Sequence, residues 1–227
     1  MAGAVMADDA GRLARLLRWC GMALMAGGVL MVVATLLHPS RETAGTIIAS
    51  EAGLIAAHAL YMLAWLLVLL GLPGLYASQR GSMGRLGLAG FLVAFSGTYL
   101  IAVGGNFGFF APVLAKEAPA VLDAIAQYWP VAVINGLAAI AFMFGYLLFG
   151  VAMTKTALPR WSGVLVAVGA PAHLLGLGIS LLVSTAAWPV AILGSVSLGL
   201  GLGWSGYRMW RSPPASDSLP LDQRTRM

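Results

Sequence analysis

Charged residues are scarce in this sequence, and their scarcity excludes a water-soluble domain. Only 9% of the 227 residues are charged and 60% are hydrophobic, whereas about a quarter of the residues of a soluble domain are charged. No pair of carboxylates falls inside an apolar run, which argues against a carrier driven by buried acids. The single cysteine, Cys20, excludes an internal disulfide. A chain this apolar needs lipid as its solvent, so we expect an all-α integral membrane protein.

Six apolar runs have the length of about 20 residues that a helix needs to cross a bilayer. They lie near residues 19–37, 53–76, 86–107, 129–153, 161–183 and 187–208. We therefore expect a six-helix transmembrane domain over residues 19–210. Residues 1–18 would form a cytoplasmic N-terminal segment. Residues 211–227 are polar and rich in proline, which predicts a disordered cytoplasmic tail.

The basic residues predict how the spans are threaded. Of the 13 basic residues, only Arg41 and Lys116 follow an odd-numbered run. The other eleven share the opposite side: Arg12, Arg15, Arg18, Arg80, Arg85, Lys155, Arg160, Arg208, Arg211, Arg224 and Arg226. Because basic loops stay in the cytoplasm, both termini are expected inside, in the inner membrane. The net charge of +5 thus orients the chain, and no nucleic-acid partner is expected.

The connection between the third and fourth runs cannot cross a bilayer. It reads "GFFAPVLAKEAPAVLDAIAQY" over residues 108–128 and contains two prolines and three charges. We expect a short amphipathic helix on the extracytoplasmic surface.

One stretch of the chain resembles known proteins. The segment "FGYLLFGVAMTKTALPRWSGVLVAVGAPAHLLGL", residues 144–177, resembles a hairpin of uncharacterised bacterial multi-span inner-membrane protein families, those known only as domains of unknown function. The "LLHP" that ends the first run and the "AHAL" of the second are similar to the same kind of protein. The resemblance implies a bacterial inner-membrane protein. It implies no activity, ligand or catalytic residue.

Polar residues inside the runs mark where a ligand could bind. His58 lies about two turns into the second run and is spaced by seven residues from both Glu51 and Trp65, so the three share one helix face. A polar face in lipid should turn toward the protein interior. One hypothesis is that His58 contacts a ligand; the other is that it only bridges helices.

His173 follows a proline in the fifth run. Pro171 removes a backbone hydrogen bond and predicts a kink, and a kink beside an imidazole opens a small polar cavity. The alternative is that Pro171 bends the helix for packing and His173 satisfies a freed carbonyl. His38, at the end of the first run, is expected to be solvated at the interface, before a proline that stops the helix. The alternative is that His38 caps the cavity, since it shares the outer side with Glu42 and Glu51.

Two similar hairpins, starting at Gly74 and Gly150, suggest an internal repeat. The alternative is that the two hairpins look alike only because inner turns need basic residues. If the repeat is real, an offset of 75–76 residues pairs His58 with the neighbourhood of Asn135, and His173 with that of Thr98 and Tyr99. Asn106 would complete an outer polar layer.

Our leading hypothesis is a non-enzymatic membrane protein with a small outward-facing polar cavity that binds, senses or passes a small molecule or lipid. The ligand-binding residues would be His58, His173, Asn135, Tyr99, Asn106 and Glu51. No cofactor, metal or catalytic residue is predicted. One alternative is an electron-transfer protein with a b-type haem on His58 and His173. In the same class is a metal site formed by His38, His58, Glu51 and His173. A second alternative is a structural subunit whose glycine faces pack on a partner or on a second copy.

Overall fold

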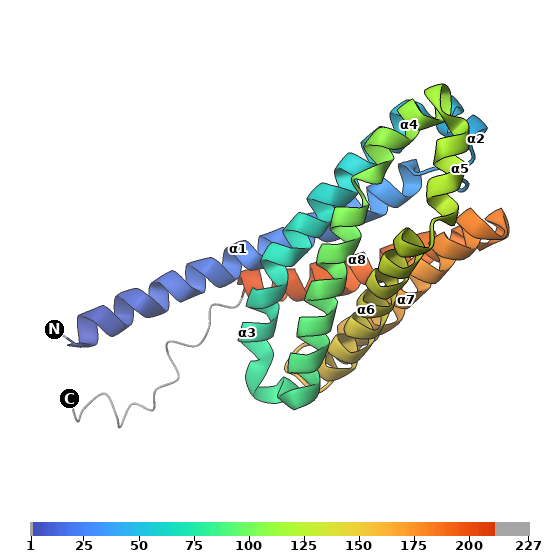
Figure 1. Ribbon diagram of the computed structural model, residues 1–227. Coiled ribbons are helices and arrows are strands. Elements are labelled where there is room, and N and C mark those ends of the chain that lie inside the picture. Colours follow the sequence, from blue (N-terminus) through green and yellow to red (C-terminus); the bar gives the residue numbers. More distant parts are fainter. Residues whose placement is uncertain (1, 212–227) are drawn as a thin grey trace.

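The described residues, 2–211, form helices and no strand in the computed structural model (Figure 1). For residues 2–10 and 126 the structure describes the backbone only. The helices are α1 (Ala2–Leu37), α2 (Ala44–Ala49), α3 (Glu51–Gly104), α4 (Phe107–Glu117), α5 (Pro119–Gln127), α6 (Trp129–Met153), α7 (Arg160–Leu182) and α8 (Trp188–Arg211), with a 3₁₀ turn at Thr185–Ala187 before α8. The expected tail lies almost wholly outside the described residues.

Within this part of the chain, five helical segments are long and apolar enough to cross a membrane. They are Gly11–Leu37, Glu51–Glu117, Trp129–Met153, Arg160–Leu182 and Thr185–Arg211. The chain is therefore compatible with a multi-pass membrane protein. The count differs from the six expected runs because the second and third runs lie in one continuous helical segment.

Helix α3 turns back on itself at Gly84. Its 54 residues would reach about 80 Å if straight, at about 1.5 Å per residue. Gly84 has φ 59° and ψ −159°, a conformation that is essentially restricted to glycine. Figure 1 shows the two arms of α3 running in opposite directions from this point. The runs at 53–76 and 86–107 lie one on each arm.

Replacing Gly84 with alanine is expected to destabilise the protein. An L-residue at these dihedral angles costs of order 1–3 kcal/mol of unfolding free energy. Gly81→Ala is a matched control, because Gly81 lies in the same turn, has no neighbour within 4 Å of an added Cβ and has no positive φ. Thermal unfolding in mild detergent should show a lower Tm for Gly84→Ala alone. Equal Tm values for the two variants would show that the turn does not depend on glycine.

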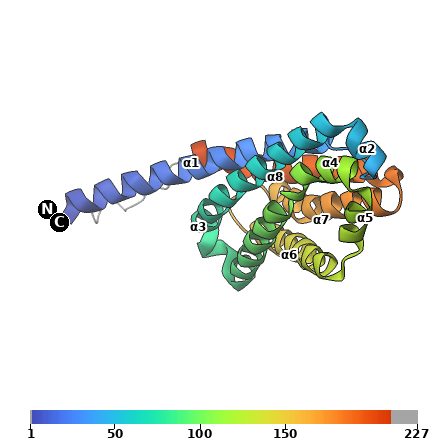
Figure 2. The same cartoon turned by 45° about the horizontal axis from the view of Figure 1, so that its top comes forward.

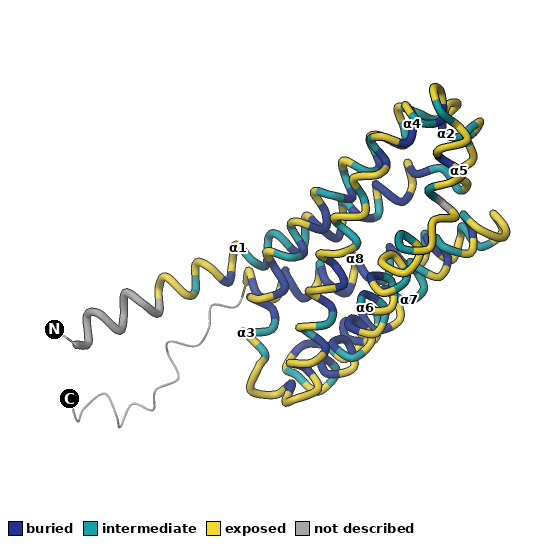
Figure 3. The backbone as a smooth tube through the Cα atoms, viewed as in Figure 1, coloured by how far each residue is buried: buried dark blue, intermediate teal, exposed yellow. Residues whose placement is uncertain are grey.

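The long helices form a closed ring of neighbours. Going round it, α1 packs on α3, the other arm of α3 on α6, α6 on α7, α7 on α8, and α8 on α1 (Figure 2). Buried residues line the inside of the ring, and exposed residues follow its outside (Figure 3). Large side chains such as Met31, Phe142 and Tyr146 fill the core. The outside carries exposed apolar side chains such as Leu66, Leu92 and Leu193, as lipid contact requires.

Three short helices cap one end of the ring. Helices α2, α4 and α5 gather at the end opposite the Gly84 turn (Figure 1) around a separate small core of Ile47, Leu54, Ala111, Ala115 and Leu122. Residues 108–128, expected to form one helix, instead form α4 and α5. The break falls at Ala118, which has φ −150° and ψ 60°, and Pro119 opens the next helix, where a missing N–H costs nothing.

Candidate functional site

A small cavity of about 120 Å³ lies inside the ring next to the cap. It is lined by His38, His58, Tyr61, Met62, Trp65, Ile101, Gly105, His173, Leu174 and Leu177. All three histidines of the chain line it, and they come from three different segments. The space is enough for a few water molecules or a small ion, at about 30 Å³ per water.

His38 is held by the backbone just after α1. Its Nδ1 lies 2.8 Å from the carbonyl oxygen of Pro39, and its ring stacks on Trp188 at 5.9 Å between centroids. Only 7% of the residue is exposed. The expectation of a solvated interfacial histidine is therefore wrong, because Trp188, His58 and Tyr61 surround the ring. The alternative, in which His38 caps the cavity, agrees with its place in the cavity lining.

His58 projects from the first arm of α3 toward His38. Its Nδ1 lies 3.0 Å from the carbonyl oxygen of Leu54, one turn earlier, and the two imidazole centroids are 5.0 Å apart. Gly108 of α4 faces this ring, and a Cβ built there would overlap it. The absence of a side chain at position 108 therefore makes the space in which the ring of His58 lies.

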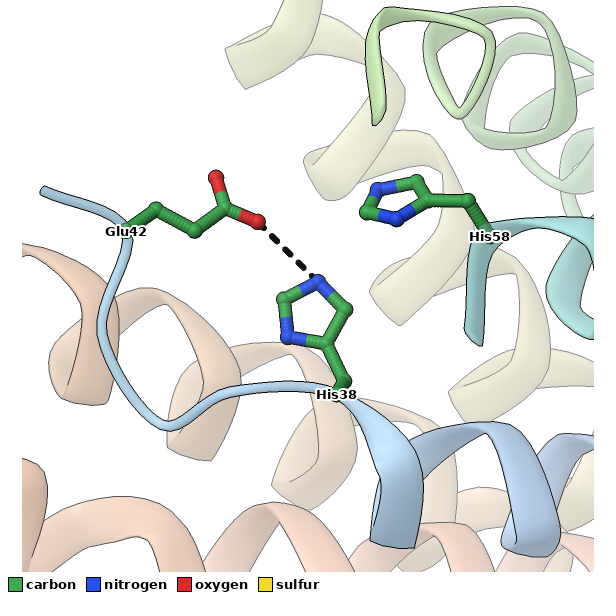
Figure 4. Close-up of side chains that lie close together, drawn as sticks. All are labelled: His38, Glu42 and His58. Carbon is green, nitrogen blue, oxygen red and sulfur yellow. Dashed lines mark ion pairs between the residues drawn. The ribbon is translucent and has the colours of Figure 1, made fainter. Parts of the chain in front are cut away.

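Glu42 completes a group of three with the two histidines (Figure 4). One carboxylate oxygen, Oε1, lies 3.0 Å from Nε2 of His38, and one potential ligand atom from each of His38, Glu42 and His58 lies within 4.8 Å of the others. Burial opposes ionisation of Glu42, but the hydrogen bond from His38 and the charges of His38 and His58 outweigh it, so the pKa of the carboxyl lies below its ordinary value. Glu42 therefore brings a negative charge to the group.

His173 lies deeper, on α7, and only 1% of it is exposed. Its Nδ1 lies 3.1 Å from the carbonyl oxygen of Ala191 on α8. The rings of Tyr61 and Trp65 lie 6.0 Å and 6.4 Å from its own. The hydroxyl of Tyr61 donates to Thr35 on α1 at 2.8 Å, which fixes this wall of the cavity.

The three hydrogen bonds give all the histidines the same tautomer. A carbonyl oxygen only accepts, so Nδ1 must donate in each case. Nε2 is then the nitrogen that keeps its lone pair in a neutral ring. Among the described residues no buried polar side-chain atom lacks a hydrogen bond. Since no partner is seen for Nε2 of His173, this atom must open to the cavity. The site can therefore bind a proton, a metal ion or a small donor molecule.

The other sequence-predicted residues do not line the cavity. Tyr99 is 56% exposed, and Asn135 is exposed, its side-chain oxygen 3.7 Å from where a Cβ of Gly104 would lie. Asn106 is exposed and donates to the carbonyl of Val103 at 3.0 Å. Of the predicted residues, His58 and His173 therefore line the same cavity, whereas the two asparagines do not. The residues that the internal repeat would pair with the histidines, Asn135 and Tyr99, lie outside the cavity lining.

Glu51 and Trp65 share a helix face with His58 but have different partners. Trp65 lines the cavity. Glu51 pairs with Lys116 of α4 at 2.6 Å, and both side chains are well exposed. This ion pair ties α4 to the start of α3 and leaves Glu51 outside the cavity.

Helix α7 is helical on both sides of Pro171, from Arg160 to Leu182, and the expected kink stays a prediction. The close contact that places His173 comes from α8, where a Cβ on Gly194 would overlap the backbone of His173.

Sequence reasoning gave Glu42 and Gly108 no role at the site. Glu42 carries a signal, since it lies four residues after His38, a spacing typical of an ion pair. Gly108 carries none, because a glycine in a segment expected on the membrane surface gives no sign of which ring it faces.

Comparison with known proteins adds no relative: no protein-family model, no curated protein and no solved structure matches the chain. Function must therefore be argued from the site.

Proposed function

We propose that the chain is a six-span protein of the bacterial inner membrane, with both termini in the cytoplasm and the cap of α2, α4 and α5 outside. Each arm of α3 contains one apolar run, which supports two spans within this helix. Arg80 and Arg85 flank the turn at Gly84, and Lys155 and Arg160 flank the turn between α6 and α7. These turns are the basic ends of the hairpins, which supports a cytoplasmic position for them.

The function that the geometry supports best is the binding of a small ligand in the histidine-lined cavity, entered from the outer side. The observation that carries this proposal is the convergence of His38, His58 and His173 on one small cavity beside the cap. Imidazoles are costly to place among apolar helices, and each of these keeps a ring nitrogen for something other than its backbone bond. No reaction is proposed, because the described part of the cavity offers no nucleophile paired with a base.

A haem site and a structural subunit have less support. A haem would need far more room than about 120 Å³, since sites for drug-sized ligands already take about 300–1,000 Å³. A structural subunit would keep its glycine faces for a partner. In this chain Gly28 of α1 and Gly199 of α8 pack on each other, a Cβ on Gly28 meeting the Gly199 carbonyl oxygen at 2.7 Å, so these faces are used internally.

Cysteine accessibility tests both the cavity and its side of the membrane. In a Cys20→Ser background, Leu177→Cys places a thiol on the cavity wall. Leu175→Cys places one two residues away on α7, at a site that is 51% exposed on the outside of the bundle. A thiol in lipid stays protonated and unreactive. We therefore expect a small, membrane-impermeant cationic thiosulfonate to modify Leu177→Cys at least about tenfold faster than Leu175→Cys in cells with a permeabilised outer membrane.

Gly45→Cys, on exposed α2, serves as the positive control for the outer side. Modification of Leu177→Cys only after cell lysis would contradict the proposed orientation. Equal rates at positions 175 and 177 would contradict a cavity that water enters.

A further inference from the structure

We propose that His38, Glu42 and His58 form a binding site for a divalent first-row transition metal ion, with Zn²⁺ as the reference ion, at the outer end of the cavity. This inference rests on the proposed function and names the class of ligand that the cavity takes. Two imidazoles and one carboxylate are a donor set that such ions prefer, whereas Mg²⁺ and Ca²⁺ prefer oxygen donors alone.

The contact between His38 and Glu42 brings two potential metal ligands together. Nδ1 of His38 donates to the carbonyl oxygen of Pro39 at 2.8 Å. The other ring nitrogen, Nε2, faces Oε1 of Glu42 at 3.0 Å. A proton on Nε2 joins the two groups in the ion pair described above. A metal ion can take the place of that proton, and it would bind Nε2 of His38, the carboxylate of Glu42 and the ring of His58.

The distances suit one ion. Ligand atoms about 2.0–2.2 Å from a tetrahedral Zn²⁺ lie roughly 3.3–3.5 Å from one another. Nε2 of His38 and Oε1 of Glu42 are 3.0 Å apart, and one ligand atom from each of the three residues falls within 4.8 Å of the others. A small movement of the His58 ring toward the pair, whose carboxylate and imidazole it already faces in Figure 4, would complete the geometry.

The surroundings hold both imidazoles as metal ligands are usually held. A ligating histidine commonly donates its other N–H to a carbonyl or carboxylate, which fixes the tautomer and orients the ring. Pro39 and Leu54 supply these carbonyls at 2.8 Å and 3.0 Å. Trp188 stacks on the ring of His38, and Gly108 leaves space for the ring of His58. The partners that orient the rings are thus present.

Three protein ligands leave a fourth position open, as in sites where zinc binds water or a small molecule. The cavity lies on that side, since His38 and His58 both line it. Its deeper wall carries His173, whose Nε2 opens to the same space. The structure therefore allows a metal-bound water or a small anion to lie between the ion and His173.

Zn²⁺ titration of the purified full chain tests the site. The protein is purified in mild detergent with a histidine-free tag, stripped with a chelator and titrated calorimetrically with ZnCl₂. We expect one ion per chain. Losing a residue that only hydrogen-bonds to a metal ligand costs roughly 10–100-fold in metal affinity. The variants His38→Gln, Glu42→Gln and His58→Gln each remove a ligand itself, so each should lower the Zn²⁺ affinity by more than about 100-fold. Co²⁺ should give a visible absorption spectrum of low-coordinate type that the three variants lack.

Glu51→Gln is the matched control, because it removes a carboxylate at the same end of the molecule but outside the group. The Glu51→Gln variant should bind Zn²⁺ as tightly as the unsubstituted chain does. Mg²⁺ should bind neither to this variant nor to the unsubstituted chain. If a variant does not fold, the unsubstituted chain still gives a result, since its Tm should rise with Zn²⁺ concentration.

Absence of Zn²⁺ binding or of a Tm shift in the unsubstituted chain would overturn the metal site. So would retained binding in Glu42→Gln and His58→Gln. If Zn²⁺ does not bind but Leu177→Cys is modified fast, the metal site is wrong and the cavity remains a site for another small ligand. Failure of both would remove the proposed function as well.

Discussion

Replacing Gly108 with alanine is expected to weaken Zn²⁺ binding by about 10–100-fold, the range typical of changing a residue that orients a metal ligand. A Cβ at this position would overlap the ring of His58, so the ring must leave the position that it takes beside His38 and Glu42. Gly108 offers no side chain to the metal ion and acts only through the space that it leaves for the ring of His58, so it is a positioning residue. Calorimetric titration with Zn²⁺ measures the change, and the Co²⁺ spectrum should shift because the ring is displaced from the ion.

Gly136→Ala is the control for a general effect of alanine in a helix. Gly136 lies on α6 with nothing within 4 Å of an added Cβ, and alanine there gains helix propensity of up to about 1 kcal/mol without a clash. A double-mutant cycle isolates the ring contact. Gly108→Ala should lower the Tm of the unsubstituted chain, because its Cβ meets the ring of His58. It should not lower the Tm in a His58→Ala background, where that space is free. An unchanged Zn²⁺ affinity in Gly108→Ala would show that the ring of His58 does not depend on this glycine.

Apolar length alone was enough to locate the three long helices that follow α5. The run at 129–153 coincides with α6, and the runs at 161–183 and 187–208 differ from α7 and α8 by only a few residues at their ends. Length could not show that the second and third runs share one helix, because the turn depends on the backbone of one residue, Gly84, rather than on a polar loop. It also missed the break at Ala118, where a proline starts a new helix.

The site was predictable only in part. A buried imidazole is costly, and this argument selected His58 and His173, which do share a cavity. It could not give the rotation of each helix about its axis, and so Tyr99 and Asn135 were expected in a cavity that they do not line. His38 and Glu42 lie in the connection after α1, where the sequence shows no periodicity. Their contact with α3 depends on how α1 and α3 pack, which only the three-dimensional structure shows.

Replacing Gly194 with leucine is expected to give the largest loss of stability, at or above about 3 kcal/mol, the upper end of the usual cost of overpacking. Gly194 lets α8 approach α7 at the site of His173. An added Cβ would lie 2.6 Å from Cα of His173 and 2.7 Å from the carbonyl carbon of Ala172. These are backbone atoms and cannot rotate away, so the helices must separate. Separation would also break the hydrogen bond from His173 to Ala191. Unfolding in mixed detergent micelles measures the free energy.

Gly178→Leu is the matched control, because Gly178 lies on α7 with nothing within 4 Å of an added Cβ. It should unfold like the unsubstituted chain. The effect at position 194 should also grow with side-chain size from alanine to leucine, since each added carbon forces α7 and α8 further apart. If Gly194→Leu were as stable as Gly178→Leu, the close packing of α7 on α8 would not be what fixes His173 in the cavity wall.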